Sequence, residues 1–457
     1  MEKELTLEVV HPHAAGIDVG SRFHMVAVNQ DKSQVREFGV YTKDHESMIA
    51  HLRMHGITTI AMESTGSYWQ TLFKALQKAG FEVLLVGGNQ TKNVKGRKTD
   101  VIDCLWIQKL HSVGMLSGSF LLSDVLQQLR VYYHHRIHII EQLTKYSNKM
   151  QKALRLMNVR LDVVLAEITG VSGMAIIKAI LAGSRDPAHL ASLADIRVKK
   201  SREEIEAALQ GSWRAELLYE LKVSLQFYNI FRASLGECDH EIETILKEHQ
   251  PSVPEGHTDD KDLVEKKKKK AVRKNVPSFD LSSIAYRYFN TDLFAIAGVS
   301  NSTVLCLLTT LGTDIKKFPT AKSFASWLRL TPNNKVSGGK VISSKSRGAK
   351  NEVAHALRHA ANAIGNLKEH ELCSFFKRVA FKKGRIAAIT ATARKLATII
   401  WNMITKAQPY QRAKVEVNTQ KQRLNKIRSL QHQVYRLNLT ENEIKRLLSM
   451  ASPSATS

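Results

Sequence analysis

The sequence predicts an α/β sheet in about the first 115 residues and a mostly helical chain after it. In that first part, short apolar segments bounded by turn residues alternate with segments of helical periodicity. From Leu126 onward, a heptad pattern of apolar residues replaces this alternation. We therefore expect an α/β domain, a long helical or coiled-coil middle and a mostly α-helical C-terminal domain.

The elements of the first part are expected in a definite order. The first two strands are joined by a hairpin-like turn at Gly20–Ser21–Arg22, and the helices between the later strands imply parallel pairing in the second half of the sheet. The predicted strands cover residues 14–19, 25–29, 35–41, 57–62 and 82–86, and the predicted helices cover residues 45–55 and 68–79, with a third that begins at residue 100.

Four acidic residues occupy the places where such a sheet binds ligands. Asp18 lies in the first strand, Glu63 ends the fourth, and Asp100 and Asp103 begin the third helix. Residues three apart share a helix face, and two adjacent carboxylates resist joint ionisation unless a cation lies between them. Carboxylates at strand ends converge in an open α/β sheet, and their hard oxygens suit Mg²⁺ or Mn²⁺. The D-x-x-D pair alone also fits a solvated helix face.

The composition points to a polyanionic partner. The chain has 457 residues and a formal net charge of +25, which is enough length for two or three domains and favours nucleic acid as the partner. We see no apolar segment of membrane-spanning length and no secretion leader, and the four cysteines form no C-x-x-C motif. A cytoplasmic protein with no membrane association is therefore expected.

A long helix is expected in the middle of the chain. The two heptad positions that form its seam comprise eleven residues, and nine of these are apolar. A helix of about 36 residues would span ~54 Å. Such a helix either pairs with a second subunit or folds back on a helical segment at residues 217–246. His134 and His138 are four residues apart, but they lie off the seam, so contact with solvent or phosphate is favoured over a metal pair. The seam residues are Leu126, Tyr133, Ile140, Ser147, Leu154 and Leu161, with Leu129, Arg136, Leu143, Met150 and Met157.

Two further patterns lie between the middle and the C-terminal part. The segments ITGVS (168–172) and IAGVS (296–300) each precede an apolar helical stretch, which indicates either a duplicated phosphate-binding turn or two independent helices. Residues 250–278 break the periodicity and contain the lysine run Lys266–Lys270, which fits a linker that is either solvated or in contact with nucleic-acid backbone.

A serine lies in a basic segment near the C-terminus. Ser337 precedes Gly338 and Gly339, which allow close approach of the backbone to a phosphate. The helix predicted at residues 353–364 follows directly, so the segment would end at a helix N-terminus, where phosphates bind. The S-G-G-K composition is by itself also that of an ordinary loop. Cations suited to phosphate binding surround the serine at Lys340, Lys345, Arg347 and Lys350.

These motifs resemble a known family. Asp18 in GIDVG, Glu63 in ESTG-x-YW and the KTD-x-x-D segment at residues 98–103, together with residues 293–358, are similar to the DEDD transposases of bacterial insertion sequences, the Piv-like, bridge-RNA-guided recombinases. The sequence differs from the usual family pattern at two of these sites. Cys104 replaces the usual alanine, and Val336 replaces the first of two serines that often precede the glycines.

The resemblance implies a structure and a mechanism. The first domain would have a RuvC-like, ribonuclease H fold, with Asp18, Glu63, Asp100 and Asp103 as a metal-binding tetrad and Ser337 as nucleophile. DNA, a guide RNA and further copies of the chain, as a dimer or tetramer, are the implied partners. The expected nucleic-acid-binding residues are Arg97, Lys98, Lys340, Lys345, Arg347 and Lys350.

We therefore expect a bacterial DNA transposase or recombinase. One alternative is a RuvC-like, junction-resolving nuclease that uses water, and another is a noncatalytic nucleic-acid-binding protein. The expected parts are a catalytic domain at residues 1–122, a helical region at 123–249, a basic linker at 250–290, a C-terminal transposase domain at 291–405 and a basic helical tail at 406–457.

Overall fold

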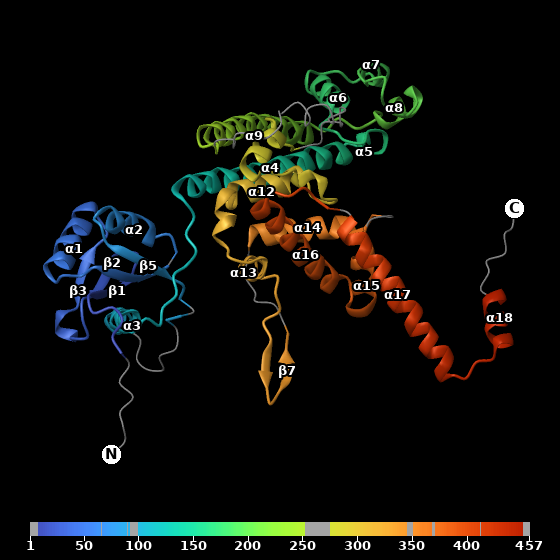
Figure 1. The fold of residues 1–457 in the computed structure, drawn as a ribbon. Coiled ribbons are helices and arrows are strands. Elements are labelled where there is room, and N and C mark those ends of the chain that lie inside the picture. The colour runs from blue at the N-terminus through green and yellow to red at the C-terminus, as the bar shows by residue number, and fades with distance from the viewer. Residues whose placement is uncertain are drawn as a thin grey trace. The chain divides into compact units, whose positions relative to one another are not determined.

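The computed structural model divides into two units, Met1–Leu121 and Leu122–Ser457 (Figure 1). It describes residues 8–64, 66–88, 90–91, 99–251, 275–344, 351–367, 371–411 and 413–450. The lysine run at residues 266–270 lies outside these ranges, as do five predicted nucleic-acid-binding residues: Arg97, Lys98, Lys345, Arg347 and Lys350.

A five-stranded mixed sheet forms the centre of the first unit. Its strand order is β3-β2-β1-β4-β5, with antiparallel pairing among the first three strands and parallel pairing of β1 with β4 and of β4 with β5. The predicted change from antiparallel to parallel pairing is thus confirmed. The strands are β1 (Ala14–Val19), β2 (Phe23–Ala27), β3 (Arg36–Gly39), β4 (Thr59–Glu63) and β5 (Glu82–Val86).

The second strand starts two residues earlier than predicted. The backbone N–H of Gly20 donates to the carbonyl oxygen of Phe23 at 3.1 Å, which closes the turn. Asp18 then pairs with Met25 across β1 and β2. The tight turn therefore brings Phe23 and His24 into the strand, which ends at Ala27 instead of Asn29.

Helices cover both faces of this sheet. On one face, α1 (Thr42–Met54) and α2 (Trp69–Lys78) bury their apolar side chains against Ile17 and Met62 in the main core. On the other face, α3 (Asp100–Ser112) packs along β1 and β2 through the buried side chain of Cys104. The arrangement is compatible with a ribonuclease H-like domain.

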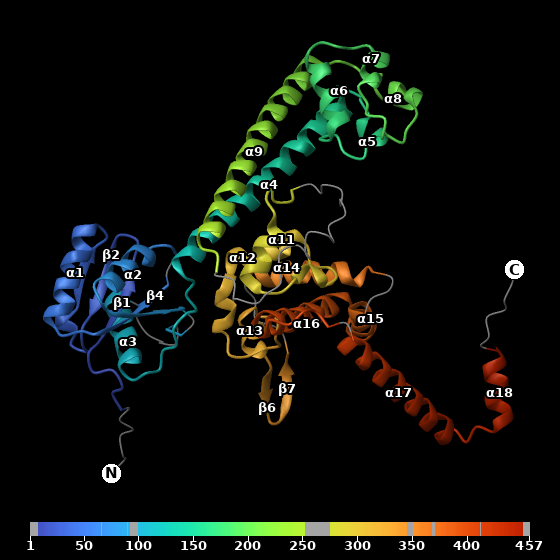
Figure 2. The same cartoon turned by 45° about the horizontal axis from the view of Figure 1, so that its top comes forward.

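The second unit contains the predicted long helix. Helix α4 (Asp124–Leu156) packs antiparallel against α9 (Ala215–Glu248) over much of its length, so the helix folds back on its own chain (Figure 2). It stops before the predicted end because Asn158 adopts a left-handed conformation with φ 59°. Every predicted seam residue is buried or half-buried.

A buried ion pair interrupts the apolar contact between these two helices. Arg136 Nε lies 2.6 Å from Asp239 Oδ1, and both side chains are almost fully buried. The other oxygen of Asp239 accepts from the backbone N–H of Ser278 at 3.0 Å, and Arg136 Nη2 donates to the carbonyl oxygen of Asn275. The pair therefore also ties Asn275 and Ser278 to the helices.

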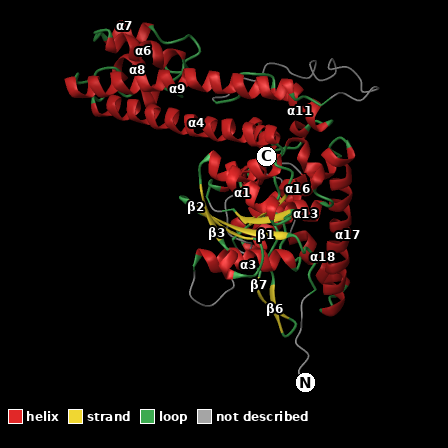
Figure 3. Ribbon diagram, turned by 90° about the vertical axis from the view of Figure 1, so that its left-hand side faces the viewer, coloured by secondary structure: helices red, strands yellow, loops and turns green. Residues whose placement is uncertain are grey.

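The remaining elements make the chain mostly helical (Figure 3). Between α4 and α9 lie α5 (Leu161–Val164), α6 (Val171–Leu181), α7 (Pro187–Ser192) and α8 (Arg202–Ala208). After α9 come α11 (Leu281–Phe289), α12 (Asn301–Thr310), α13 (Ala321–Trp327), the strands β6 (Lys335–Ser337) and β7 (Lys340–Ser343), α14 (Glu352–Gly365), α15 (Glu371–Lys383), α16 (Arg385–Lys406), α17 (Ala413–Arg436) and α18 (Glu441–Met450).

Candidate functional site

Asp18 and Glu63 lie side by side at the ends of two neighbouring strands. They follow Ile17 and Met62, which are register partners in the parallel pair of β1 and β4. Since Ile17 and Met62 point into the core beneath α1 and α2, strand alternation turns both carboxylates to the opposite face. That is the face on which α3 packs.

Helix α3 brings two more carboxylates to this face. Its N-cap is Thr99, whose hydroxyl accepts from the backbone N–H of Ile102 at 3.3 Å, and the first turn contains Asp100 and Asp103. The helix N-terminus favours negative charge, which fits acidic residues at these positions. Asp103 is half-buried, while Asp100 is exposed.

The helix approaches the strand closely because Gly16 has no side chain. A Cβ at Gly16 would lie 2.5 Å from the carbonyl oxygen of Cys104 and 2.7 Å from Gln108 Cα. Burial, together with the nearby carboxylates of Asp18 and Asp103, raises the pKa of the Cys104 thiol to about 12. Asp18 and Asp103 therefore both lie within electrostatic reach of this buried thiol.

Glu63 is held by residues that follow β5. Its Oε2 accepts from the hydroxyl of Thr91 at 2.6 Å. A Cβ at Gly88 would lie 2.6 Å from its Oε1, so a larger residue there would displace the Glu63 carboxylate. The sequence prediction missed both neighbours, although the two glycines after the last strand signal a close backbone approach.

The donor chemistry of these four residues fits a hard divalent cation, because all their donors are carboxylate oxygens. The four side chains do not form a complete ligand set in this structure. Within the described parts of the chain, no three His, Cys, Asp or Glu side chains are grouped so that they could share a metal ion. The structure thus brings Asp18, Glu63 and Asp103 to one sheet face without showing a formed metal site.

Ser337 lies in the second unit, on a two-stranded hairpin. It pairs with Lys340 across the turn formed by Gly338 and Gly339, whose φ angles are +55° and +75°. Two consecutive positive φ angles are typical of a type I′ turn and explain both glycines. The side chains of Ser337 and Lys340 are exposed, and a Cβ at either glycine would meet open space. A phosphate can therefore approach this turn closely.

The two histidines of α4 do not form a metal pair. His134 Nε2 lies 3.0 Å from Glu352 Oε1 at the start of α14, and His138 Nδ1 lies 3.7 Å from Glu141 Oε2. Glu352 also lies 3.5 Å from Arg130. No sequence pattern predicts the contact of His134 with Glu352, because the two residues are far apart in the chain. The contact adjoins a cavity of about 590 Å³ among α4, α12 and α14.

The two I-x-G-V-S segments differ in backbone conformation. Gly170 is extended, with φ −77°, and caps α6 directly. Gly298 has φ 82°, and α12 begins only after its N-cap, Ser300. The first segment runs into α6 and the second ends just before α12, so they are not copies of one local turn.

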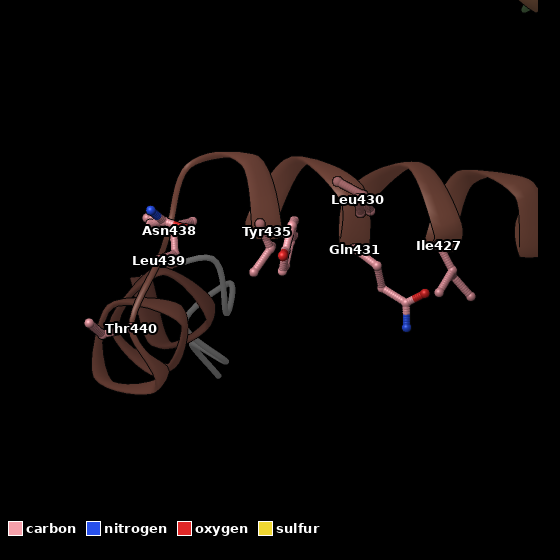
Figure 4. A pocket seen from close by; sticks show the side chains of 8 residues that line it. Ile427, Leu430, Gln431, Tyr435, Asn438, Leu439 and Thr440 are labelled. Carbon is pink, nitrogen blue, oxygen red and sulfur yellow. The ribbon is translucent and has the colours of Figure 1, made fainter.

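A groove of about 720 Å³ runs along α17 toward the start of α18 (Figure 4). It contains none of the predicted site residues. Its lining is largely apolar and consists of Ile427, Leu430, Gln431, Val434, Tyr435, Asn438, Leu439 and Thr440.

A mixed five-stranded sheet with carboxylates at adjacent strand ends, and with a further acidic pair on the helix against them, is compatible with the ribonuclease H-like domains of enzymes that process nucleic acids. Two family models match the chain: a DEDD transposase model of IS110 type over residues 15–159, and the Transposase IS116/IS110/IS902 family over residues 290–373. The chain belongs to the DEDD transposases of IS110 type. No curated protein matches it. None of the described helices has the length and apolar character that crossing a membrane requires.

Proposed function

We propose that this transposase cuts and rejoins DNA strands of an insertion sequence through a carboxylate site and a serine nucleophile. Asp18, Glu63, Asp100 and Asp103 hold one or two divalent cations, Mg²⁺ or Mn²⁺, and Ser337 attacks the phosphodiester. The observation that carries the proposal is the placement of Asp18 and Glu63, next to each other on the sheet face against which the helix of Asp100 and Asp103 packs.

The residues around the acids have distinct roles in this mechanism. A divalent cation held by these carboxylates would supply Lewis-acid polarisation of the phosphodiester and neutralise its charge. Thr91 holds the Glu63 carboxylate in place through its hydrogen bond, and Gly16 lets α3 approach β1 so that Asp103 lies near Asp18. Both are positioning residues, because each acts through a carboxylate of the site.

Ser337 supplies the covalent step. Its Oγ forms a bond to phosphorus as the bond between phosphorus and a DNA oxygen breaks; the serine loses its proton, and the leaving DNA oxygen gains one. A hydroxyl at a second strand end then reverses the reaction and releases the serine. The ammonium group of Lys340, across the hairpin turn, stabilises the negative charge of the transition state. Ser337 and the carboxylates belong to different units, so the mechanism requires the units to meet, within one chain or between two.

The partners follow from the family and the charge. The net charge of +25 fits DNA and a guide RNA, which would select the DNA to be joined. A dimer or tetramer in the bacterial cytoplasm, with residues 1–122 and 291–405 as catalytic and transposase domains, completes the proposal. A basic linker at 250–290 and a basic tail at 406–457 would flank the second of these domains, and the coiled-coil form of the middle region remains a prediction.

The test uses end-labelled DNA from the sequences flanking the coding region, together with RNA transcribed from them. The proposal predicts cleavage that requires Mg²⁺ or Mn²⁺ and yields a protease-sensitive protein–DNA adduct. Metal-dependent cleavage with free ends and no adduct would support the water-using nuclease instead. Salt-dependent binding without any cleavage would support a noncatalytic nucleic-acid-binding protein.

A further inference from the structure

The turn between α15 and α16 combines exposed apolar side chains with strong positive charge. From Leu372 to Lys406 the chain contains eight Lys and Arg residues and no Asp or Glu. Phe381 and Ile386, on the two sides of the turn, are 93% and 84% exposed. We call residues 381–386 the α15–α16 tip. It lies beyond the residues that the family models match.

The tip is a fixed structure and not a loose loop. Gly384 is the only residue between the two helices, and its φ of 82° places it in a conformation that favours glycine. Its N–H donates to the carbonyl oxygen of Ala380 at 2.8 Å, and its own carbonyl accepts from Ala388 at 3.2 Å. Helices α15 and α16 therefore pack side by side directly from this residue (Figures 1 and 2).

One cation of the tip is used to hold it against α14. Arg385 Nη2 donates to Asn362 Oδ1 at 2.7 Å and to Asn366 Oδ1 at 2.8 Å. The guanidinium also lies over the ring of Phe376, 5.6 Å from its centroid, and Phe376 is buried. The position of the tip is thus set by polar and aromatic contacts before any ligand binds.

Two other cations of the tip, and one cation from the preceding turn of α15, remain available. Lys377, Lys382 and Lys383 are exposed, and within the described residues no carboxylate forms an ion pair with any of them. Three exposed ammonium groups that form no ion pair within the described residues, close in sequence to an aromatic ring that is almost entirely exposed, are complementary to a polyanion with flat apolar faces. Nucleic acid has both properties.

We propose that the α15–α16 tip binds unpaired nucleotides, with Phe381 stacked on a base and Lys377, Lys382 and Lys383 in contact with phosphates. An aromatic side chain can stack only on a base face that is not covered by a neighbouring base, so the tip favours single strands and melted sites over intact duplex. The inference rests on the proposed function, because strand cleavage and rejoining generate unpaired bases near the protein.

The experiment measures binding of the full-length protein by fluorescence anisotropy in EDTA. Three DNA probes of equal length are compared: an intact duplex, the same duplex with a short central unpaired stretch, and a single strand. Phe381→Ala should weaken binding to the two probes with unpaired bases about tenfold and leave duplex binding unchanged, since base–aromatic stacking is worth on the order of that factor. Phe381→Trp should restore the affinity.

Two further variants complete the design. Replacing Lys382 and Lys383 with Gln should weaken binding to all three probes and reduce the slope of log affinity against log salt by about 1 to 2. Ile196→Ala is the matched control, because Ile196 is a fully exposed apolar residue on a loop between α7 and α8. It should bind all three probes as the wild type does.

Equal affinity of Phe381→Ala and wild type for the probe with the unpaired stretch would overturn the proposal. So would a loss of equal size on intact duplex, because no base contact would then exist. Phe381-dependent binding to phosphatidylserine vesicles, without such dependence on DNA, would replace it with a membrane contact. The assay needs no cleavage, so failure of the tip and failure of the proposed chemistry are separate results: Asp18→Asn should keep the Phe381-dependent binding.

Discussion

Ser337 and Lys340 face each other as register partners across the two glycines of the β6–β7 hairpin. A serine hydroxyl is a weak nucleophile until a base, a metal or positive charge activates it. Register partners project from the same face of a hairpin, so the serine and lysine side chains lie on one side of an exposed turn. The hairpin therefore presents a nucleophile and a cation to a phosphate together.

Ser337→Ala should abolish both cleavage and the covalent protein–DNA adduct, because no other hydroxyl occupies this place in the turn. The adduct is measured as a protease-sensitive band on a denaturing gel with end-labelled DNA. Ser343→Ala, on the second strand of the same hairpin, is the control and should form the adduct normally. If Ser337→Ala still cleaves and leaves free 5′ phosphate and 3′ hydroxyl ends, water is the nucleophile.

Gly16→Ala should impair cleavage although Gly16 carries no reacting group. The added Cβ would clash with the backbone of α3 at Cys104 and Gln108, so the helix must move away from β1 and take Asp103 with it. Overpacking of this kind costs about 1–3 kcal/mol of stability. Gly87→Ala is the matched control, since a Cβ at Gly87 meets open space and its φ is not left-handed. Urea unfolding and cleavage rates of the two variants should differ clearly.

Breaking the buried pair of Arg136 and Asp239 should destabilise the second unit by about 3–5 kcal/mol, because a single substitution leaves the other charge buried and unpaired. Arg136→Met and Asp239→Leu should each show this loss in urea unfolding. The double variant should be more stable than either single one. Single losses that simply add in the double variant would show that the two residues do not interact.

The first unit should lose stability as the pH falls from about 6.5 to about 4. Burial, followed by the neighbouring His45 and His11 respectively, lowers the pKa of both His24 and His111 to about 4. Their unfolded forms bind protons near pH 6.5, so within this window the unfolded state carries more protons and stability rises with pH. Each histidine contributes at most about 1.4 kcal/mol per pH unit.

Amide hydrogen exchange in β1 and β4, corrected for intrinsic rates, measures this loss. His111→Gln removes one titrating group and should make the pH dependence of stability shallower. Gln is chosen because its side-chain amide can replace the hydrogen bond between His111 Nε2 and the Thr59 hydroxyl, which are 3.0 Å apart. An unchanged pH dependence in this variant would show that His111 does not titrate on unfolding.

The strands and helices around the acids could be predicted because local patterns specify them. Apolar segments between turn residues gave five strands, and the position of the acids at strand ends and at a helix start gave the expectation that Asp18, Glu63, Asp100 and Asp103 converge. Which sheet face they share follows only from the packed structure. The seam of α4 could also be predicted from its heptad pattern. Its one charged member, Arg136, is explained by its ion pair with Asp239 on α9, a helix that is distant in sequence.

Contacts between distant segments could not be predicted in this way. The hydrogen bond from Thr91 to Glu63, the contact of His134 with Glu352 and the anchoring of Arg385 by α14 each depend on tertiary packing, which no periodicity encodes. The two I-x-G-V-S segments likewise have similar sequences but different turns, because the surrounding elements determine the φ angle of each glycine.

The most direct test compares metal-dependent strand cleavage by wild type, Asp18→Asn, Glu63→Gln and Glu82→Gln. Glu82 is the control: it is an exposed carboxylate of the same sheet, at the start of β5 and therefore at the opposite end of the parallel strands from Glu63. Asp18→Asn and Glu63→Gln should each reduce the cleavage rate roughly a hundredfold or more while DNA binding persists, and Glu82→Gln should cleave normally. Normal cleavage by Asp18→Asn, or wild-type cleavage that continues unchanged in EDTA, would contradict the carboxylate site.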